Sequence, residues 1–548
     1  MGLGASCCAE EDLTEGPKEP PEVVSSYTDP PHSEAEPRAE AAHELSASRV
    51  PSKWSRLQHM RHLEVDAEIL RGIPLQASLR SLGELWRRSP VDLHEQARLG
   101  LYDLSVPVEE FDVFLSHTWM TPGRYKVLSL LFQAGWKHML LGQSLGVTVA
   151  VVLSMQRWLP LPFDLPSDFE ELAHLTCPFF PWCLLMAFAG SFLALMLVPY
   201  CPSLGGRDPL CFLDVVSIHQ VDNELMERGI YGLGGFLRMS RELRVLWSAP
   251  YLSRLWCVFE LAAYRMANPG GRIVVSPVFV ETGVLLTILF TYFVALLFSM
   301  ITVLQEVARF TVYVISLTPV MLLMHLLRRN NMSKHQLLSD LRHFDLEEAH
   351  CRNEFDREFI HRAIVEWYGS KSAFTEYVRG PLREGLLRSS KSTFPLRYLV
   401  MVVSVTFCTS LDPLVSSWLC GVDGQLILSE FVASSFGFHV CWFLAMLRIL
   451  IYLCDRFAAP IYPGMLDYLQ TLVIFAVFFV LYYAGQVASR AAYTTSLSLA
   501  VVWTCLAVLA AILALSFFAG KRPCSEKGKE RTTGPDCQGQ AQDRAPVA

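Results

Sequence analysis

The hydrophobic pattern of this chain alternates between long apolar runs and shorter mixed segments. Eight runs are long and carry few charges, and they cover residues 139–156, 178–199, 282–304, 308–327, 397–419, 428–454, 466–486 and 495–519. A helix needs roughly 20 apolar residues to cross a bilayer, and most of these runs supply them. The pattern therefore predicts about eight transmembrane helices: a hairpin at 139–199, a second hairpin at 282–327 and four helices over 397–519.

Between the first and third spans, the pattern changes to that of a sheet with helices. Short apolar runs of strand type lie at 111–116, 210–216, 243–247 and 272–279, and helical patterns lie at 124–138, 224–241 and 253–267. Strands that alternate with helices indicate a parallel sheet covered on both faces. The first transmembrane hairpin would split this sheet domain into residues 111–138 and 200–281.

The remaining segments are polar. Residues 51–110 have the periodicity of short amphipathic helices, and residues 328–396 form a helical segment that we expect to supply packing surface to the sheet. Residues 1–50 are rich in Glu, Pro, Ala and Ser, which predicts a disordered acidic tail, and residues 520–548 predict a second disordered tail.

Basic residues next to the spans predict the orientation of the chain. Lysines and arginines flank the spans at 124–137, 328–334, 383–397 and 521–522, whereas the loop at 157–177 is acidic. Basic residues collect on the cytoplasmic side of membrane proteins. We therefore expect an integral, multi-pass membrane protein with both termini in the cytosol, and an even number of spans returns both parts of the sheet to that side.

Composition agrees with a protein that is part membrane and part cytosolic. The chain has 548 residues, of which 52% are hydrophobic and 18% charged. The net charge of −7, with no basic stripe, predicts no nucleic-acid partner. The 15 cysteines form no CxxC pair and no His/Cys ligand pattern, so we expect no metal site. Cys177, Cys183 and Cys420 fall near the expected outer face, where a disulfide among them is open but not given by their spacing.

The chain begins Met-Gly-Leu-Gly-Ala-Ser-Cys-Cys, which matches a dual lipidation pattern. Gly2 followed by Ser6 fits N-myristoylation, and Cys7 and Cys8 are candidates for palmitate. Two acyl chains anchor a protein stably, whereas one binds the membrane only marginally. We expect a lipidated N-terminus in contact with membrane lipids; the alternative is a chance Met-Gly start.

Two motifs resemble the signature blocks of TIR (Toll/interleukin-1 receptor) domains. Residues 111–117, Phe-Asp-Val-Phe-Leu-Ser-His, are similar to the first block, and residues 245–261 are similar to the block that joins the third strand to its helix. Residues 227–230 resemble the loop after the second strand. The resemblance covers about residues 109–281 without the hairpin and implies a flavodoxin-like parallel sheet. The chain departs from the family in that hairpin, and no fifth strand or last helix is obvious after Phe279.

The resemblance implies a signalling or scaffold function first. In TIR domains the loop after the second strand mediates self-association, which places an interaction loop at Glu227, Arg228, Gly229 and Ile230. Homo-oligomers or other TIR-like domains are then the expected partners.

The alternative is a membrane-tethered NAD glycohydrolase. Some TIR domains cleave NAD with a glutamate that corresponds to Glu260, and Trp256, Ser248 and Tyr251 would then contact the nucleotide. NAD would be a substrate, and no cofactor is required. A carboxylate can stabilise an oxocarbenium-like ribose, and Trp256 lies one helical turn before Glu260. The competing interpretation is that Glu260 is only a hydrogen-bonding acid beside a helix core.

A third hypothesis is a channel or transporter with a regulatory TIR-like domain. Asp412, Glu430 and His439 are ionisable residues within predicted spans, where charge often marks a transport path. Asp412 and Glu430 lie near the outer ends of their spans, so we expect both to reach water. At the strand ends, His117 and His219 occupy positions where doubly wound folds place ligands, and Asp214 is expected within the second strand.

Overall fold

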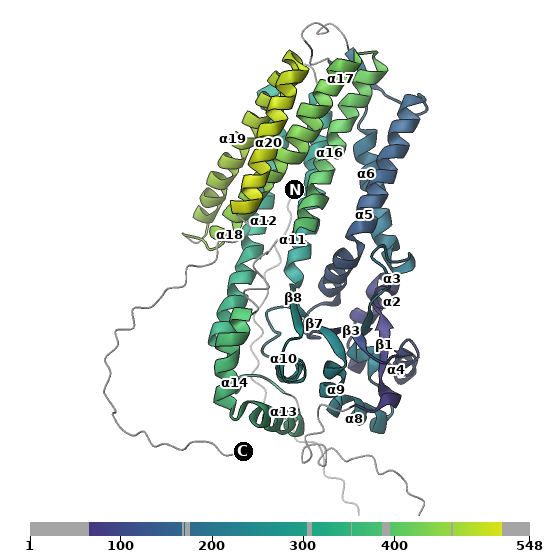
Figure 1. The fold of residues 1–548 in the computed structure, drawn as a ribbon, viewed down its shortest axis with the longest axis vertical. Coiled ribbons are helices and arrows are strands. Elements are labelled where there is room, and N and C mark those ends of the chain that lie inside the picture. Colours follow the sequence, from purple (N-terminus) through teal and green to yellow (C-terminus); the bar gives the residue numbers. More distant parts are fainter. Residues whose placement is uncertain are drawn as a thin grey trace, which may run out of the picture. The chain divides into compact units, whose positions relative to one another are not determined.

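The computed structural model describes residues 65–166, 169, 176–303, 309–351, 353–385, 395–461 and 464–517. This part of the chain is mostly helical, with a small mixed sheet (Figure 1). Both predicted tails lie outside the described residues, as do the lipidation candidates Gly2, Cys7 and Cys8.

Eight helices in the described part of the chain are long and apolar enough to cross a membrane, in agreement with the predicted number. They are α5 (Gly123–Met155), α6 (Trp182–Leu197), α11 (Val278–Thr302), α12 (Arg309–His343), α16 (Leu396–Leu419), the continuous run α17–η8–α18 (Gly424–Glu430, Phe431–Trp442, Phe443–Arg456), α19 (Leu466–Thr495) and α20 (Leu497–Phe517). The structure corrects one boundary: residues 124–138 and the first span are a single helix, α5. Its 33 residues extend about 50 Å, well beyond the ~30 Å hydrocarbon core.

The sheet has six strands in the order β2-β1-β6-β3-β7-β8. They are β1 (Arg71–Pro74), β2 (Val106–Pro107), β3 (Phe111–Ser116), β6 (Leu210–Phe212), β7 (Ser240–Trp247) and β8 (Arg272–Pro277). The four predicted strands run parallel to one another, and β3 lies between β6 and β7, with Val113 opposite Cys211 and Phe114 opposite Leu243. Thus β3 and β6 pair although α5 and α6 separate them along the chain.

Strands β1 and β2 are an antiparallel edge that the sequence did not predict. The segment 65–110 was expected to be helical throughout, but β1 pairs with β6 through Ile73 and Cys211. This four-residue strand contains a glycine and a proline and lacks the alternation of apolar and polar residues that predicts a strand. Its Gly72 allows a close approach, because a Cβ there would lie 2.9 Å from the Phe111 ring.

The second predicted strand is also shorter than expected. It ends at Phe212, and Asp214–Ser217 form one helical turn, α7, so Asp214 does not lie in the strand. The Asp214 carboxylate accepts a hydrogen bond from the N–H of Val215 at 2.8 Å, which favours the turn over an extended backbone. The third strand, in contrast, begins three residues early because β7 pairs with both β3 and β8.

Helix α10 (Leu255–Ala267) packs on the sheet, and the segment after α12 covers α10. This cover consists of α13 (Glu354–Tyr368), α14 (Lys371–Tyr377) and the turn η7 (Val378–Leu382). The ring of Phe259 on α10 lies 5.9 Å from that of Phe359 and 5.6 Å from that of Trp367. These rings belong to one hydrophobic core that extends from the sheet to α13.

The sheet joins the membrane-length helices without a flexible connection. Strand β8 ends at Pro277, and α11 begins at Val278. Within the first turn of α11, the buried Glu281 carboxylate accepts hydrogen bonds from the Tyr398 hydroxyl of α16 at 2.6 Å and the Ser129 hydroxyl of α5 at 3.0 Å. Three membrane-length helices are thereby fastened together beside the sheet, at what we call the sheet end of the bundle.

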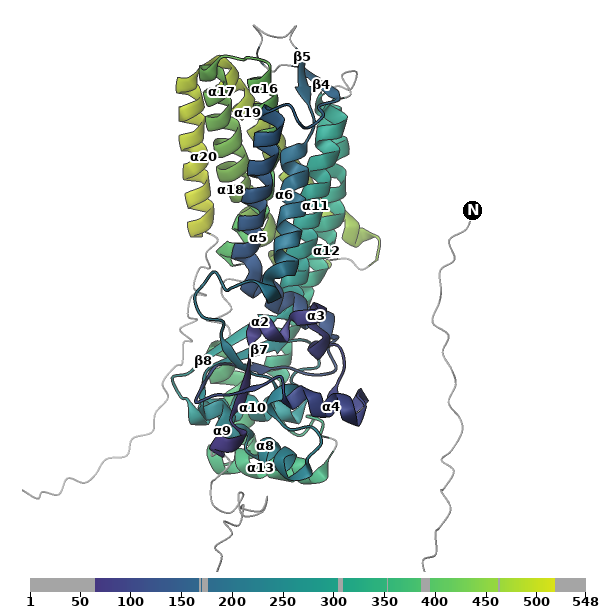
Figure 2. The same ribbon diagram turned by 90° about the vertical axis from the view of Figure 1, so that its right-hand side faces the viewer.

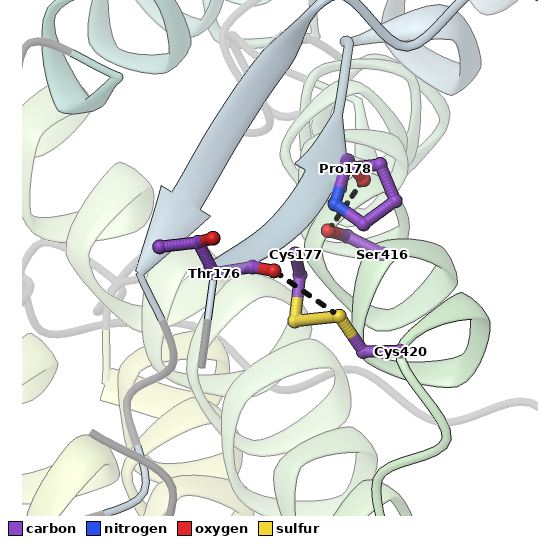
Figure 3. The surroundings of a disulfide bond; sticks show 5 residues. All are labelled: Thr176, Cys177, Pro178, Ser416 and Cys420. Carbon is purple, nitrogen blue, oxygen red and sulfur yellow. Dashed lines mark hydrogen bonds between the residues drawn. A yellow bond between two sulfur atoms is a disulfide. The ribbon is translucent and has the colours of Figure 1, made fainter. Parts of the chain in front are cut away.

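The opposite, or disulfide, end carries the short strands β4 (Phe163–Pro166) and β5 (Thr176–Phe179) (Figure 2). A disulfide joins Cys177 to Cys420, with a Cα–Cα distance of 5.6 Å, and the Ser416 hydroxyl donates to the Pro178 carbonyl at 2.8 Å (Figure 3). The pairing is therefore 177 with 420, and Cys183 is a free, buried thiol. These contacts fix the α5–α6 hairpin to α16.

Asp412 strengthens the same junction, and its position corrects an expectation. Its side chain is not open to water but buried, with 5% exposure, and it accepts hydrogen bonds from the backbone N–H groups of Cys183 at 2.7 Å and Leu184 at 3.1 Å. Those N–H groups belong to the first turn of α6, whose partial positive charge attracts a carboxylate. Asp412 thus caps α6, and this role accounts for a buried carboxylate at this position without an ion path. Glu430 is likewise buried, with 8% exposure.

Replacing the Asp412 carboxylate should weaken the bundle. In Asp412→Ala, two buried N–H groups lose their acceptor, so we expect the free energy of unfolding to fall by about 1–3 kcal/mol. Equilibrium denaturation of the purified protein in mixed micelles measures this loss. The matched control is Asp164→Ala, at an exposed carboxylate in the neighbouring β4, which should change the free energy by less than about 0.5 kcal/mol. Equal effects of the two variants would contradict the capping role.

Candidate functional site

The candidate site lies where the central strand β3 ends. Ser116 is the last residue of β3, and its hydroxyl hydrogen-bonds both the Glu260 carboxylate on α10 and the Tyr251 hydroxyl from the loop before α10. Tyr251 is fully buried, while Glu260 is partly buried. The structure therefore brings two predicted site residues together through a serine that the sequence analysis did not single out.

The surroundings of Glu260 favour its neutral form. Burial raises the pKa of this carboxyl to about 8, the hydrogen bond from Ser116 opposes the rise, and the negative charge of Asp214 adds to it. The carboxyl is therefore mostly protonated at neutral pH. It becomes a full carboxylate only in mildly alkaline solution.

A second group of polar side chains lies beside the first, after the ends of β3 and β6. The Trp119 indole N–H donates to the Asp214 carboxylate at 2.8 Å, and His117 Nε2 lies 3.9 Å from the same carboxylate. Burial, followed by the positive charge of Lys126, lowers the pKa of His117 to about 4, so its ring is neutral at pH 7. Asp214, with a side chain 39% exposed, connects this group to solvent.

Lys126 is the least expected member of this group. Its side chain has no exposed surface, its ammonium lies 4.5 Å from the centre of the Trp119 ring, and it donates a hydrogen bond to the Thr118 carbonyl at 3.2 Å. A cation over an indole face is stabilised by the ring quadrupole. The sequence carried one signal for this residue: a lysine among the apolar positions at the start of a helix.

Cys257 does not have the environment of a nucleophile. Its thiol is buried and donates to the His117 carbonyl at 3.5 Å. Burial, followed by the charge of Glu260, raises the pKa of the thiol well above its ordinary range. A reactive cysteine needs a lowered pKa, so these surroundings do not favour Cys257 as a nucleophile.

Trp256 contacts a different element from Glu260. Its indole N–H points to the Asp356 carboxylate of α13 at 3.4 Å, and its ring lies 6.3 Å from the Phe359 ring. The Glu260 carboxylate, one turn further along α10, contacts β3 instead. The indole of Trp256 therefore makes these contacts in the interface between α10 and α13.

Ser248 lines a cavity of about 420 Å³ beyond the ends of β3, β7 and β8. Its hydroxyl is hydrogen-bonded to that of Thr121, and α12 closes the far wall with Asn330, Gln336 and Asp340. Doubly wound sheets bind ligands in the crevice outside the carboxyl ends of their strands. Ser248 thus occupies a position suited to ligand contact.

The residues predicted as an interaction loop are helical, which corrects that expectation. Glu227, Arg228, Gly229 and Ile230 lie within α8 (Asn223–Tyr231). The helix starts because the Asp222 carboxylate accepts the N–H groups of Glu224 and Leu225, at 2.9 and 3.0 Å.

The partners of two of these residues are within the chain. Arg228 forms ion pairs with Asp66 at 3.0 Å and Glu68 at 3.2 Å. Gly229 is packed so closely that a Cβ would lie 2.9 Å from the Ile218 side chain. Glu227, in contrast, is exposed. His219, which was expected near a ligand, instead accepts a hydrogen bond at Nδ1 from the N–H of Asp222 at 2.8 Å and so stabilises the loop before α8.

The raised pKa of Glu260 predicts a pH-dependent stability. Since the folded protein holds this proton up to about pH 8 and the unfolded chain releases it near the ordinary glutamate value, the contribution of Glu260 to stability is present at low pH and is lost as pH rises through 8. We expect Glu260→Gln to flatten the decline in unfolding temperature between pH 5 and pH 8, measured by thermal denaturation. The control is the exposed Glu109→Gln, which should keep the wild-type slope. A wild-type slope in Glu260→Gln would contradict the raised pKa.

No protein-family model, curated protein or solved structure matches this chain. What the site can do is therefore argued from its own residues. Among the residues that the structure describes, no three His, Cys, Asp or Glu side chains come together as metal ligands. The site combines a partly buried carboxyl, a buried ammonium and a neutral imidazole at the ends of parallel strands.

Proposed function

We propose that this chain is a membrane-anchored signalling protein that acts through homotypic contacts of a TIR-like domain. The observation that carries the proposal is the direct continuation of β8 into α11, with the Glu281 contacts to α5 and α16 beside it. Since no flexible linker separates sheet from helix there, a displacement of the helices in the membrane would displace the sheet. Such a coupling is what a membrane signalling protein needs.

The strand order supports the TIR-like assignment. Numbered along the chain, the parallel strands β3, β6, β7 and β8 have the order 2-1-3-4, which is the start of the flavodoxin-like order. The block at residues 111–117 falls on the central strand and the turn after it, and the block at 245–261 runs from the third parallel strand into α10. The antiparallel edge formed by β1 and β2 is an addition to that pattern.

Cysteine chemistry supports the proposed orientation. A structural disulfide persists in an oxidising compartment, and the pair Cys177–Cys420 lies at the end opposite the sheet. At the sheet end, Cys201, Cys211, Cys257 and Cys351 are free thiols. We therefore assign the sheet and both termini to the cytosol, where an N-terminus lipidated at Gly2, Cys7 and Cys8 would contact the inner leaflet.

The outer face of α8 is the self-association surface that we favour. The exposed residues of this face are Asp222 at the start of the helix, then Asn223, Glu224 and Glu227, and they give it an acidic character. Copies of the chain anchored in one membrane meet in two dimensions. A homo-oligomer, or a complex with another TIR-like domain, would form where this acidic face meets a basic surface of the neighbouring domain, since two acidic faces repel each other.

Charge reversal on α8 tests this surface. We expect Glu227→Lys to lower energy transfer between donor- and acceptor-labelled copies in reconstituted vesicles at least twofold, because the reversed charge spoils the complementarity of the contact. The matched control is Glu95→Lys, an exposed glutamate on α4 (Glu95–Tyr102), which should leave the transfer unchanged. If both variants behave as the wild type, α8 is not the contact surface.

The second candidate function is NAD glycohydrolysis, and the position of Glu260 on α10, beside the end of the central strand, favours it. In this reaction the bond between ribose C1′ and nicotinamide breaks, nicotinamide leaves with the electron pair, and water adds to C1′ and releases a proton to solvent. An ionised Glu260 would stabilise the positive charge on the ribose. Because burial keeps the carboxyl protonated up to about pH 8, this function requires alkaline conditions or a substrate that lowers the pKa.

Nicotinamide release separates the two functions. With purified full-length protein and NAD, the scaffold proposal predicts no release above that of heat-denatured protein at either pH 7 or pH 9. The enzyme alternative predicts release that increases at least threefold from pH 7 to pH 9, is lost in Glu260→Gln, and persists in the exposed control Glu109→Gln. The second pattern, read out by chromatography of nicotinamide, would overturn the scaffold as the sole function.

A further inference from the structure

A second cavity in the described part of the chain lies inside the membrane-length bundle, away from the sheet. It has a volume of about 430 Å³ and is lined by α11, α12, α16, α17–η8–α18 and α19, with β4 and β5 at one end. Along α11 its wall extends from Thr287 to Thr302, which is about 22 Å at 1.5 Å per residue. The cavity therefore runs along the helices for much of the ~30 Å thickness of a hydrocarbon core.

The charged side chains in the lining of this cavity lie at one end only. Toward the sheet end the wall is mainly apolar and includes Val320, Leu323, Leu447, Leu450 and Phe478. Toward the disulfide end apolar rings remain, but the wall there also includes Ser410, Glu430, Ser434, Gln486 and Arg490. Such a lining suits a molecule with a hydrocarbon chain at one end and a polar headgroup at the other.

The polar part of the wall offers both signs of charge. Glu430 contributes a carboxylate and Arg490 a guanidinium, each on a different helix. Both side chains already interact within the chain, so a headgroup would add to these interactions rather than fill an empty place. A headgroup with one positive and one negative charge complements such a wall better than a singly charged or neutral one. Ligand pockets of roughly 300–1,000 Å³ with a few placed polar groups are the usual form of a small-molecule site, and this cavity has that form.

His439 adds a polar position between the two halves. Its ring lines the cavity, and its Nδ1 is buried without a hydrogen-bond partner among the described residues. A buried ring nitrogen without a partner costs free energy, and a hydroxyl that enters the cavity would relieve that cost. A hydroxyl just below the headgroup is what a glycerol lipid with only one acyl chain carries.

We propose that this cavity binds a single-chain zwitterionic lipid of the lysophosphatidylcholine class, with its acyl chain toward the sheet end. The charged headgroup lies near Glu430 and Arg490, and the free glycerol hydroxyl lies near His439. The inference does not rest on the proposed signalling function, because binding is measurable by itself. It does give that function a stimulus, since the wall of the cavity includes α11, which continues from β8.

Photolabelling of the full-length protein in nanodiscs tests the proposal. The probe is lysophosphatidylcholine with a diazirine and an alkyne in its acyl chain. We expect saturable labelling of peptides from α11 and α19 that unlabelled lysophosphatidylcholine displaces. Thr291→Trp, which fills the cavity, should lower the labelling at least fivefold, whereas Phe293→Trp, at a position of the same helix that is 53% exposed, should not. Ser299→Leu, a smaller change on the same wall, replaces Thr291→Trp if that variant does not fold.

The headgroup has its own comparison. Arg490→Gln should lower labelling by the lysophosphatidylcholine probe at least threefold and leave labelling by a monoacylglycerol probe of equal chain length unchanged. Equal loss with both probes would refute the zwitterionic assignment. If Thr291→Trp leaves the labelling unchanged, the probe binds around the bundle rather than in the cavity, and the proposal is wrong. Equal labelling by a two-chain phosphatidylcholine probe would refute the single-chain assignment.

Discussion

The pairing of β3 with strands on both of its edges is the interaction on which the rest of the structure depends. Val113 lies opposite Cys211 of β6 on one side and Glu242 of β7 on the other. Because the α5–α6 hairpin lies between β3 and β6 in the chain, this pairing requires the hairpin to begin and end on the same side of a membrane. The sheet therefore constrains the topology of the spans, and the spans in turn limit how far the two parts of the sheet can separate.

Much of this architecture could be predicted from the sequence because strong local patterns encode it. The eight apolar runs and the four parallel strands each carry their own hydrophobic signal, and α10 ends at Ala267 as expected. The features that the sequence did not predict depend on partners distant in the chain. Strand β1 exists because β6 offers an edge, and Arg228 on α8 is paired with Asp66, which lies 162 residues earlier in the chain.

The site was predicted in part for the same reason. Glu260 and Tyr251 come from a motif, and the structure brings them together, but the serine between them lies on a strand more than a hundred residues earlier. The burial of Lys126 against Trp119 depends on how α5 leaves the sheet. Such environments decide protonation states. The motif therefore predicts that a carboxyl group lies at position 260, but its protonation state at pH 7 depends on burial in the folded protein.

The disulfide has a consequence for biosynthesis. Cys177 and Cys420 are separated by 243 residues, and all six strands of the sheet are complete by Pro277. A chain made from its N-terminus therefore has every strand of the sheet before Cys420 or α16 exists. Cys177, between α5 and α6, therefore remains a free thiol until α16, the fifth long helix, and Cys420 have been synthesised. Closure of that one bond marks the moment when the later helices are locked to the earlier ones.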